Sequence, residues 1–299
     1  MGQARPCPAC AGSDATSWAT VDAYPIVRCA RCRTLYTVAL PADATADYAA
    51  YYSEATLEPP AFVGASLDRI VAGFEPYRQT NRLLDVGFGA AAALCAAERA
   101  GWQVAGVEVS GQAVAHAKEL GLDVFHGVAA DAPYAPGSFD VVLLIEVLEH
   151  VADPASLLRE VRPLIRTGGA LWATTPHGRG LSARLLGGDW TVVAPPEHLQ
   201  LFSTRGIRAL LGATGFVPVT VTTKSINPLE LVAWAKAKVR RQGPNPDFNR
   251  GEAAYRLVEA SSRRPAVRAA KWTVNQALRG TGLGDSLRIL ARPDSGAST

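Results

Sequence analysis

The feature that most constrains the fold of this chain is an alternation of apolar and amphipathic segments between residues 81 and 223. Apolar runs of strand length occur at residues 82–87, 102–109, 122–127, 138–145, 168–176 and 216–223. Between them lie stretches with helical spacing of apolar residues, at residues 90–101, 111–121, 153–165 and 203–215. Continuous apolar strands that alternate with amphipathic helices are typical of a parallel sheet covered on both faces. The pattern therefore predicts an α/β fold built on such a sheet.

A four-cysteine pattern precedes this region. Cys7, Cys10, Cys29 and Cys32 follow the spacing C-x2-C-x18-C-x2-C, which lies within the range of zinc ribbons. Four thiolates complete a tetrahedral zinc site, so no position is left open for catalysis. We therefore predict a structural Zn²⁺ in a ribbon over residues 1–38. Two disulfides or free thiols are the alternatives, and a reducing compartment disfavours the disulfides.

Length and charge set broad limits on the function. With 299 residues the chain has room for about two domains. It contains no uncharged apolar run of the ~20 residues that span a bilayer, and its first residues do not resemble a secretory signal. We therefore expect a soluble, cytoplasmic protein. The net charge is only +3, but residues 236–294 hold 13 Lys and Arg against 5 Asp and Glu. Solvated helix faces explain this excess, and an anionic substrate or a membrane surface is the alternative.

The ends of the first two predicted strands carry a candidate ligand site. Asp85, Gly87 and Gly89 follow the first apolar run, and Glu108 ends the second. Ligands of parallel α/β sheets bind at the carboxyl ends of the strands, where an acid in the position of Glu108 holds ribose hydroxyls. The glycine spacing also fits a dinucleotide-binding turn. However, a carboxylate at Asp85 would repel a pyrophosphate and favours a ligand with an ammonium group, such as S-adenosylmethionine.

Four segments together resemble the class I S-adenosylmethionine-dependent methyltransferases. They are LLDVGFGAAAA, VAGVEVSGQAVAHAKELGLDVFHG, SFDVVLLIEVLEHVADPASLLREVRPLIRTGGALWATTP and PPEHLQLFSTRGIRALLGATGF. The resemblance implies a Rossmann-like, seven-stranded methyltransferase domain over residues 81–223 and 282–293, whose last segment is the closing antiparallel strand. Residues 39–80 would form a helical linker or cap, and residues 224–281 a helical insertion. With its ribbon, the chain is similar to bacterial methyltransferases that modify sugars, polysaccharide precursors or secondary metabolites.

The resemblance also implies roles for individual residues around the cofactor. Asp85, Gly87 and Gly89 would line its methionine part. Glu108, with Val109 beside it, would bind the ribose.

Two further acids belong to this predicted cofactor site. Glu146, after the fourth predicted strand, would lie beside the cofactor. Many relatives carry an Asp for the adenine directly after the glycine that ends the third strand, but here Val128 follows Gly127. Asp131 is the nearest acid and the candidate to replace it, with the backbone near Ala129 as the alternative.

Three histidines are candidate catalytic bases, because imidazole titrates near neutral pH. His150 follows the fourth predicted strand, His177 follows the fifth, and His198 lies in a proline-rich loop. His177 departs from relatives, which usually carry Asn there. A structural or substrate-orienting role is the alternative for each of them.

Two other features near these histidines bear on catalysis. Glu149, between Glu146 and His150, adds the option of a divalent metal, although a helical or hydrogen-bonding role is simpler. Trp190, with Pro195 and Pro196, is expected on a wall or lid of the acceptor pocket, and a position in the core is the alternative.

We therefore predict an O-methyltransferase that acts on a small molecule, sugar or glycan, with S-adenosylmethionine and structural zinc as cofactors. A ribosomal RNA methyltransferase that docks RNA through the ribbon is one alternative, and nucleic acid is not the expected partner. A nicotinamide-dependent dehydrogenase and a non-catalytic scaffold are the others. The basic insertion adds the option of a weak membrane-surface contact, and the oligomeric state stays open.

Overall fold

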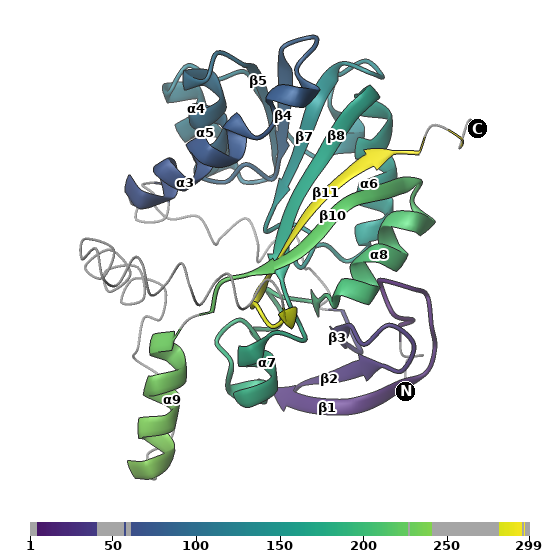
Figure 1. Ribbon diagram of the computed structural model, residues 1–299, viewed down its shortest axis with the longest axis vertical. Helices are drawn as coiled ribbons and strands as arrows, with labels where there is room; N and C mark the ends of the chain where they lie inside the picture. The colour runs from purple at the N-terminus through teal and green to yellow at the C-terminus, as the bar shows by residue number, and fades with distance from the viewer. Residues whose placement is uncertain are drawn as a thin grey trace.

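The computed structural model describes residues 5–40, 57, 61–226, 228–240, 281–294 and 296. Within them a seven-stranded sheet and a four-stranded sheet form the framework (Figure 1). Of the predicted linker over residues 39–80, residues 41–56 and 58–60 lie outside the described residues, as does most of the predicted insertion over residues 224–281. From those segments the structure shows the helices α3 (Ala61–Ala72) and α9 (Pro228–Arg240).

The large sheet has the strand order β10-β11-β8-β7-β4-β5-β6. The strands are β4 (Arg82–Val86), β5 (Gln103–Glu108), β6 (Val124–His126), β7 (Phe139–Ile145), β8 (Ile165–Pro176), β10 (Phe216–Lys224) and β11 (Ser286–Pro293). β4 to β8 pair in parallel, whereas β11 runs antiparallel to both of its neighbours. The predicted seven-stranded methyltransferase sheet, with its antiparallel closing strand, is therefore confirmed.

Helices cover both faces of this sheet (Figure 1). One face carries α3, α4 (Ala92–Arg99) and α5 (Gly111–Glu119), and the other carries α6 (Pro154–Val161) and α8 (Thr204–Ala213). Three of the described helices begin with a side-chain cap. Asp153 accepts hydrogen bonds from two backbone amides at the start of α6, and Ser110 and Ser203 each accept one at the starts of α5 and α8. Such caps satisfy amides that have no partner within the helix.

The core divides into two layers because successive side chains of a strand point to opposite faces. Leu83, Val141 and Leu143 belong to the cluster that includes residues of α3 and α4. Their neighbours Leu84 and Val142 belong to the cluster on the side of α6 and α8. All five side chains are buried, so the middle of the sheet is fixed from both sides.

The four-stranded sheet combines the N-terminal segment with a distant part of the chain. It consists of β1 (Ala15–Val21), β2 (Tyr24–Cys29), β3 (Leu35–Thr37) and β9 (Gln200–Leu201). Leu35 of β3 pairs with Leu201 of β9. In addition, the Ser203 hydroxyl donates a hydrogen bond to the carbonyl of Cys32. The cysteine-bearing segment is therefore built into the same unit as the large sheet, which the sequence did not indicate.

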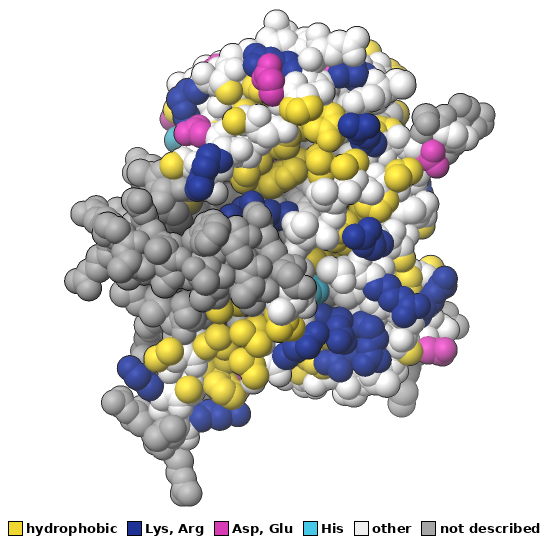
Figure 2. Space-filling view, viewed as in Figure 1, with side chains coloured by type: hydrophobic (Ala, Val, Ile, Leu, Met, Phe, Trp, Pro, Cys, Tyr) yellow, Lys and Arg dark blue, Asp and Glu magenta, His cyan; other side chains and the backbone are white. Residues whose placement is uncertain are grey.

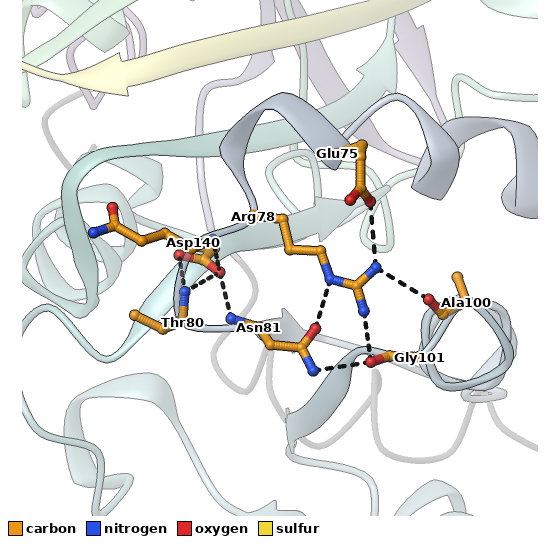
Figure 3. A network of polar contacts seen from close by, with 8 residues as sticks. Glu75, Arg78, Thr80, Asn81, Ala100, Gly101 and Asp140 are labelled. Atoms are coloured by element: carbon orange, nitrogen blue, oxygen red, sulfur yellow. Dashed lines mark hydrogen bonds and ion pairs between the residues drawn. The ribbon is translucent and has the colours of Figure 1, made fainter.

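A polar network fixes the edge of the large sheet where its strands begin (Figure 3). The buried carboxylate of Asp140 accepts hydrogen bonds from the backbone amides of Gln79, Thr80 and Asn81 and pairs with Arg166. Burial opposes ionisation of Asp140, but Arg166 and the amides outweigh it, so the pKa of this carboxyl is lowered. Arg78 donates to the carbonyls of residues 100 and 101 at the end of α4.

None of the described helices is both long enough and apolar enough to cross a membrane.

Candidate active site

Asp85 is the second-to-last residue of β4, at the edge of the large sheet where the parallel strands end. Its side chain is buried, and its Oδ1 atom has no hydrogen-bond partner. Burial and then the charge of Glu108 raise the pKa of Asp85 to about 8. A buried carboxylate without a partner is costly, so this position fits a ligand that supplies a positive charge.

The turn after β4 brings backbone close to the neighbouring segments. Gly87 has φ +75°, and a Cβ there would lie 2.7 Å from Cγ2 of Val147. Gly89 also has a positive φ, and its amide donates a 3.0 Å hydrogen bond to Oε2 of Glu108. Glycine adopts this conformation without strain, so the two glycines let the turn pass close to the end of β7 and to Glu108.

Glu108 ends β5 with its side chain buried. Besides Gly89, the amides of Val109 and Ser110 donate to its Oε1 atom, at 2.8 and 3.0 Å. A carboxylate can accept about four hydrogen bonds, so one acceptor position remains for a ligand hydroxyl. The structure thus brings Asp85, the glycine turn and Glu108 together, as the sequence predicted.

The other two predicted cofactor acids are more exposed. Glu146 follows β7 with φ +53°, and its amide donates to the carbonyl of Thr174 in β8. Asp131 is exposed at the end of a short 3-10 helix, η2 (Ala129–Asp131), which follows β6. Val128, just before η2, is 44% exposed.

His150 and His198 lie together next to a buried acid. Their ring centroids are 4.7 Å apart. Nδ1 of His150 lies 2.9 Å from the carbonyl of Glu197, and Nδ1 of His198 lies 2.6 Å from the carbonyl of Val192. A carbonyl only accepts, so both Nδ1 atoms donate and Nε2 is the proton acceptor of each neutral ring.

The environment of this pair changes the acidity of two groups. Burial, followed by the charge of His198, lowers the pKa of His150 to about 4. Glu149 is fully buried in a turn rather than on a helix. Burial and then the charge of Glu146 raise the pKa of Glu149 well above its usual value. Each of Glu149, His150 and His198 offers a ligand atom within 4.8 Å of the others, which is a geometry that can also hold a cation.

His177 lies just beyond the end of β8 and is buried. Its Nδ1 atom donates to the carbonyl of Gly284 at 2.8 Å, while its Nε2 atom is buried without a hydrogen-bond partner. Burial lowers the pKa of His177 to about 4, and the charges of Arg179 and Arg184 act in the same direction. The ring is therefore neutral at pH 7 and offers Nε2 as an acceptor.

The four cysteines of the N-terminal ribbon form one cluster. The Sγ atoms of Cys7 and Cys32 are 3.5 Å apart, and those of Cys10 and Cys29 are 3.6 Å apart. All four Sγ atoms lie within 4.8 Å of one another, and none forms a disulfide. A tetrahedral zinc site with Zn–S bonds of ~2.3 Å has S–S edges of about 3.8 Å, so the cluster fits a zinc ion.

Trp190 does not line an open pocket. It is 3% exposed and packs in a cluster with Ile26 and Leu35 of the ribbon sheet and Leu186. The expectation of a wall or lid is therefore wrong. A loop that lines an open pocket and a loop that is buried in the core have similar sequences when the segment that packs on the loop is distant in the chain.

A family model described as a methyltransferase domain matches residues 60–221 of this chain. The chain belongs to this methyltransferase family. It is 33% identical over 163 residues to a ubiquinone biosynthesis O-methyltransferase of Ralstonia nicotianae, which covers 50% of this chain and 68% of that protein. A protein of the same name from Caulobacter vibrioides is 31% identical over 172 residues, with the same coverage.

Solved structures show the same fold in this methyltransferase. Geranyl diphosphate C-methyltransferase from Streptomyces coelicolor A3(2) matches with a TM-score of 0.54 at 17% identity, over 85% of this chain and 100% of that one. A SAM-dependent methyltransferase from Archaeoglobus fulgidus matches with a TM-score of 0.52 at 16% identity, over 80% and 96%. These structures show the fold, whereas the family model and the 33% identical relative show the activity: the chain is an S-adenosylmethionine-dependent methyltransferase.

Proposed function

We propose that this methyltransferase methylates a hydroxyl oxygen of a small-molecule acceptor. The observation that carries the proposal is the neutral His150 at the acceptor edge of the sheet, with a buried acid beside it. Hydroxyl nucleophiles need a base, because the proton must leave as the oxygen attacks. The similarity to proteins named ubiquinone biosynthesis O-methyltransferases supports transfer to oxygen.

The cofactor site proposed here uses the residues of β4 and β5. Asp85 would bind the ammonium of S-adenosylmethionine, because its buried Oδ1 atom has no hydrogen-bond partner and lies at the strand ends beside the glycine turn. Glu108 would bind the ribose through its remaining acceptor capacity, and the turn at Gly87 and Gly89 would leave room for the methionine chain. When bound, the cofactor supplies an electrophilic methyl group on a good, neutral leaving group. We assign Glu146 and Asp131 to the outer rim of this site because both are exposed.

The histidines differ in what they can do with a proton. A proton moved from the acceptor hydroxyl to Nε2 of His150 would lie close to Glu149, since Nε2 and Oε1 of Glu149 are 4.0 Å apart. An ionised Glu149 would stabilise the resulting imidazolium by charge attraction. His177 has positively charged arginines as neighbours, so protonation there is disfavoured. We therefore propose His150 as the base, His198 as its packing partner and His177 as a hydrogen-bond acceptor that orients the acceptor molecule through a second hydroxyl, away from the reactive one.

We further propose that Cys7, Cys10, Cys29 and Cys32 hold a structural Zn²⁺. The metal would act on the site through β9, which belongs to the ribbon sheet. The side-chain amide nitrogen Nε2 of Gln200 in β9 donates to the backbone carbonyls of Leu148 and Val151, at 2.6 and 2.7 Å. These carbonyls flank His150, so the ribbon positions the turn that carries the proposed base. Reduced thiols and this cofactor suit the cytoplasm.

Methyl transfer from isotopically labelled S-adenosylmethionine tests the proposal. Purified protein would be incubated with separate pools of phenols, sugars, amines and total RNA, and the labelled product identified by mass spectrometry. We expect the label on oxygen of a phenol or sugar, with loss of transfer in His150→Ala and normal cofactor binding in that variant. Label found in RNA, or only on nitrogen or carbon, would overturn it.

A further inference from the structure

Four arginines from two distant segments gather beside the end of β8. Arg28 lies in β2 and Arg33 lies two residues before β3, whereas Arg179 lies two residues before α7 (Leu181–Leu185) and Arg184 lies within it. Figure 2 shows Lys and Arg side chains gathered over the region where Figure 1 places β2 and β3.

The backbone explains how these segments meet. Arg28 pairs with Leu35 in β3, and Leu35 pairs with Leu201 in β9. The next residue, Phe202, forms a bridge with His177, two positions before Arg179. This continuous ladder holds the ribbon arginines and the arginines after β8 on one side of the candidate site.

The cluster has no counter-charge. Within the described residues, no Asp or Glu lies within ion-pairing distance of Arg28, Arg33, Arg179 or Arg184. Nε of Arg28 is also buried without a hydrogen-bond partner. Burial and then the neighbouring arginines lower the pKa of both Arg28 and Arg179. Uncompensated guanidinium groups at close range cost free energy, which an anion would recover through charge-assisted hydrogen bonds.

A second observation connects the cluster with the acceptor side of the site. His177 is buried, its Nε2 atom has no hydrogen-bond partner among the described residues, and the charges of Arg179 and Arg184 act on its ring. A neutral acceptor nitrogen under the influence of two guanidinium groups matches a ligand that carries both an anionic oxygen and a hydroxyl.

We propose that Arg28, Arg33, Arg179 and Arg184 bind a phosphate or diphosphate group of the methyl acceptor. The inference rests on the proposed function, because it assigns a substrate class to the same site. It also sets a length for the acceptor. The amide of Glu146, which would lie beside the cofactor, donates to the carbonyl of Thr174 in β8, and His177 lies three residues further along the chain, just past the end of β8, or about 10 Å at ~3.3 Å per residue. The phosphate would therefore lie about 10 Å or more from the reactive oxygen.

Calorimetric titration with inorganic pyrophosphate, at constant ionic strength and in the presence of saturating S-adenosylhomocysteine, tests the assignment. The test variant is the double substitution Arg179→Gln/Arg184→Gln. Arg205→Gln/Arg208→Gln is the matched control, because it removes the same charge from the exposed side of α8. We expect pyrophosphate binding to weaken about tenfold for each arginine removed from the cluster and to stay unchanged in the control.

Three outcomes separate the possibilities. Loss of pyrophosphate binding in the test variant alone, with unchanged S-adenosylhomocysteine affinity, supports the inference. Equal pyrophosphate binding in all three proteins overturns it, while leaving the proposed function intact if S-adenosylhomocysteine still binds. Sedimentation with phosphatidylglycerol vesicles that depends on Arg179 and Arg184, without pyrophosphate binding, also overturns it and assigns the cluster to a lipid surface. A wild-type protein that does not bind S-adenosylhomocysteine contradicts the proposed function instead.

Discussion

The protonation of Asp85 gives the sharpest prediction of this site. In the ligand-free protein, burial and Glu108 raise the pKa of Asp85 to about 8, so this carboxyl is mostly protonated at pH 7. Binding of a ligand ammonium requires the ionised form. The ligand must therefore displace the proton from Asp85 as it binds, and its affinity must depend on pH.

The size of this effect follows from the pKa. At pH 7 a group with a pKa of about 8 holds about 0.9 proton, so binding releases about 0.9 proton per chain. The population of ionised Asp85 rises about 50-fold between pH 6 and pH 8, and the affinity should rise by the same factor. The ammonium group of the ligand stays protonated over this range.

Calorimetry of S-adenosylhomocysteine binding in buffers of different ionisation enthalpy measures both quantities. In the variant Asp85→Asn we expect no proton release, a loss of affinity at pH 8 and a flat pH dependence. A wild-type affinity that does not change between pH 6 and pH 8, without proton release, would show that Asp85 does not bind the ammonium.

The stability of the free protein provides an independent control. The folded pKa of Asp85 lies above the value of about 3.9 expected in the unfolded chain. Its contribution to stability is therefore complete below that value and is lost as the pH rises through about 8. Asp85→Asn should accordingly raise the melting temperature strongly at pH 8.5 and much less at pH 5, even though it weakens ligand binding. A lower melting temperature at pH 8.5 would indicate that the variant has lost packing instead.

Three further predictions concern the rest of the molecule. Metal analysis should find about one zinc per chain. Cys29→Ser should lower the zinc content and also turnover, because the ribbon supports the turn that carries the proposed base. A folded, active protein without zinc would refute this. His150→Ala should lower kcat at least about 100-fold with little change in S-adenosylhomocysteine affinity, whereas His198→Ala should lower it less, and equal activity of all three proteins would exclude both rings from catalysis. Asp140→Asn should destabilise the fold by about 2–4 kcal/mol in urea unfolding at pH 7, because it leaves the partly buried Arg166 without its partner. Since the Asp140 pKa is lowered, this loss of stability should vanish as the pH falls below about 4. Identical unfolding midpoints at pH 7 would contradict the last prediction.

Much of the proposed cofactor site is predictable from sequence because it is local. Asp85 and Gly87 lie in a single strand and the turn that follows it, and Glu108 ends the next strand along the chain. In a parallel sheet, consecutive strand ends meet at one edge, so their proximity follows from the order of strands alone. The fixed spacing of the cysteines likewise allows the Sγ cluster to be anticipated.

The parts that sequence does not reveal depend on long-range pairing. β9 contains two residues, Gln200 and Leu201, and their pairing with β3 bridges more than half of the chain. Nothing in such a short segment indicates its partner. The burial of Trp190 and the meeting of Arg28 with Arg179 both follow from this pairing, and were therefore mispredicted or missed. The acidity of Glu149 depends on burial by segments that are equally distant in sequence.

The most direct test of the central claim is the choice of ligand by the wild-type protein. Equilibrium titrations of the full chain at pH 8, one with S-adenosylhomocysteine and one with NAD⁺, compare a ligand that carries an ammonium with one that carries a pyrophosphate. The account predicts one S-adenosylhomocysteine per chain and no NAD⁺ binding, because the buried carboxylate of Asp85 at the end of β4 attracts the first group and repels the second. Binding of NAD⁺ without binding of S-adenosylhomocysteine would contradict it.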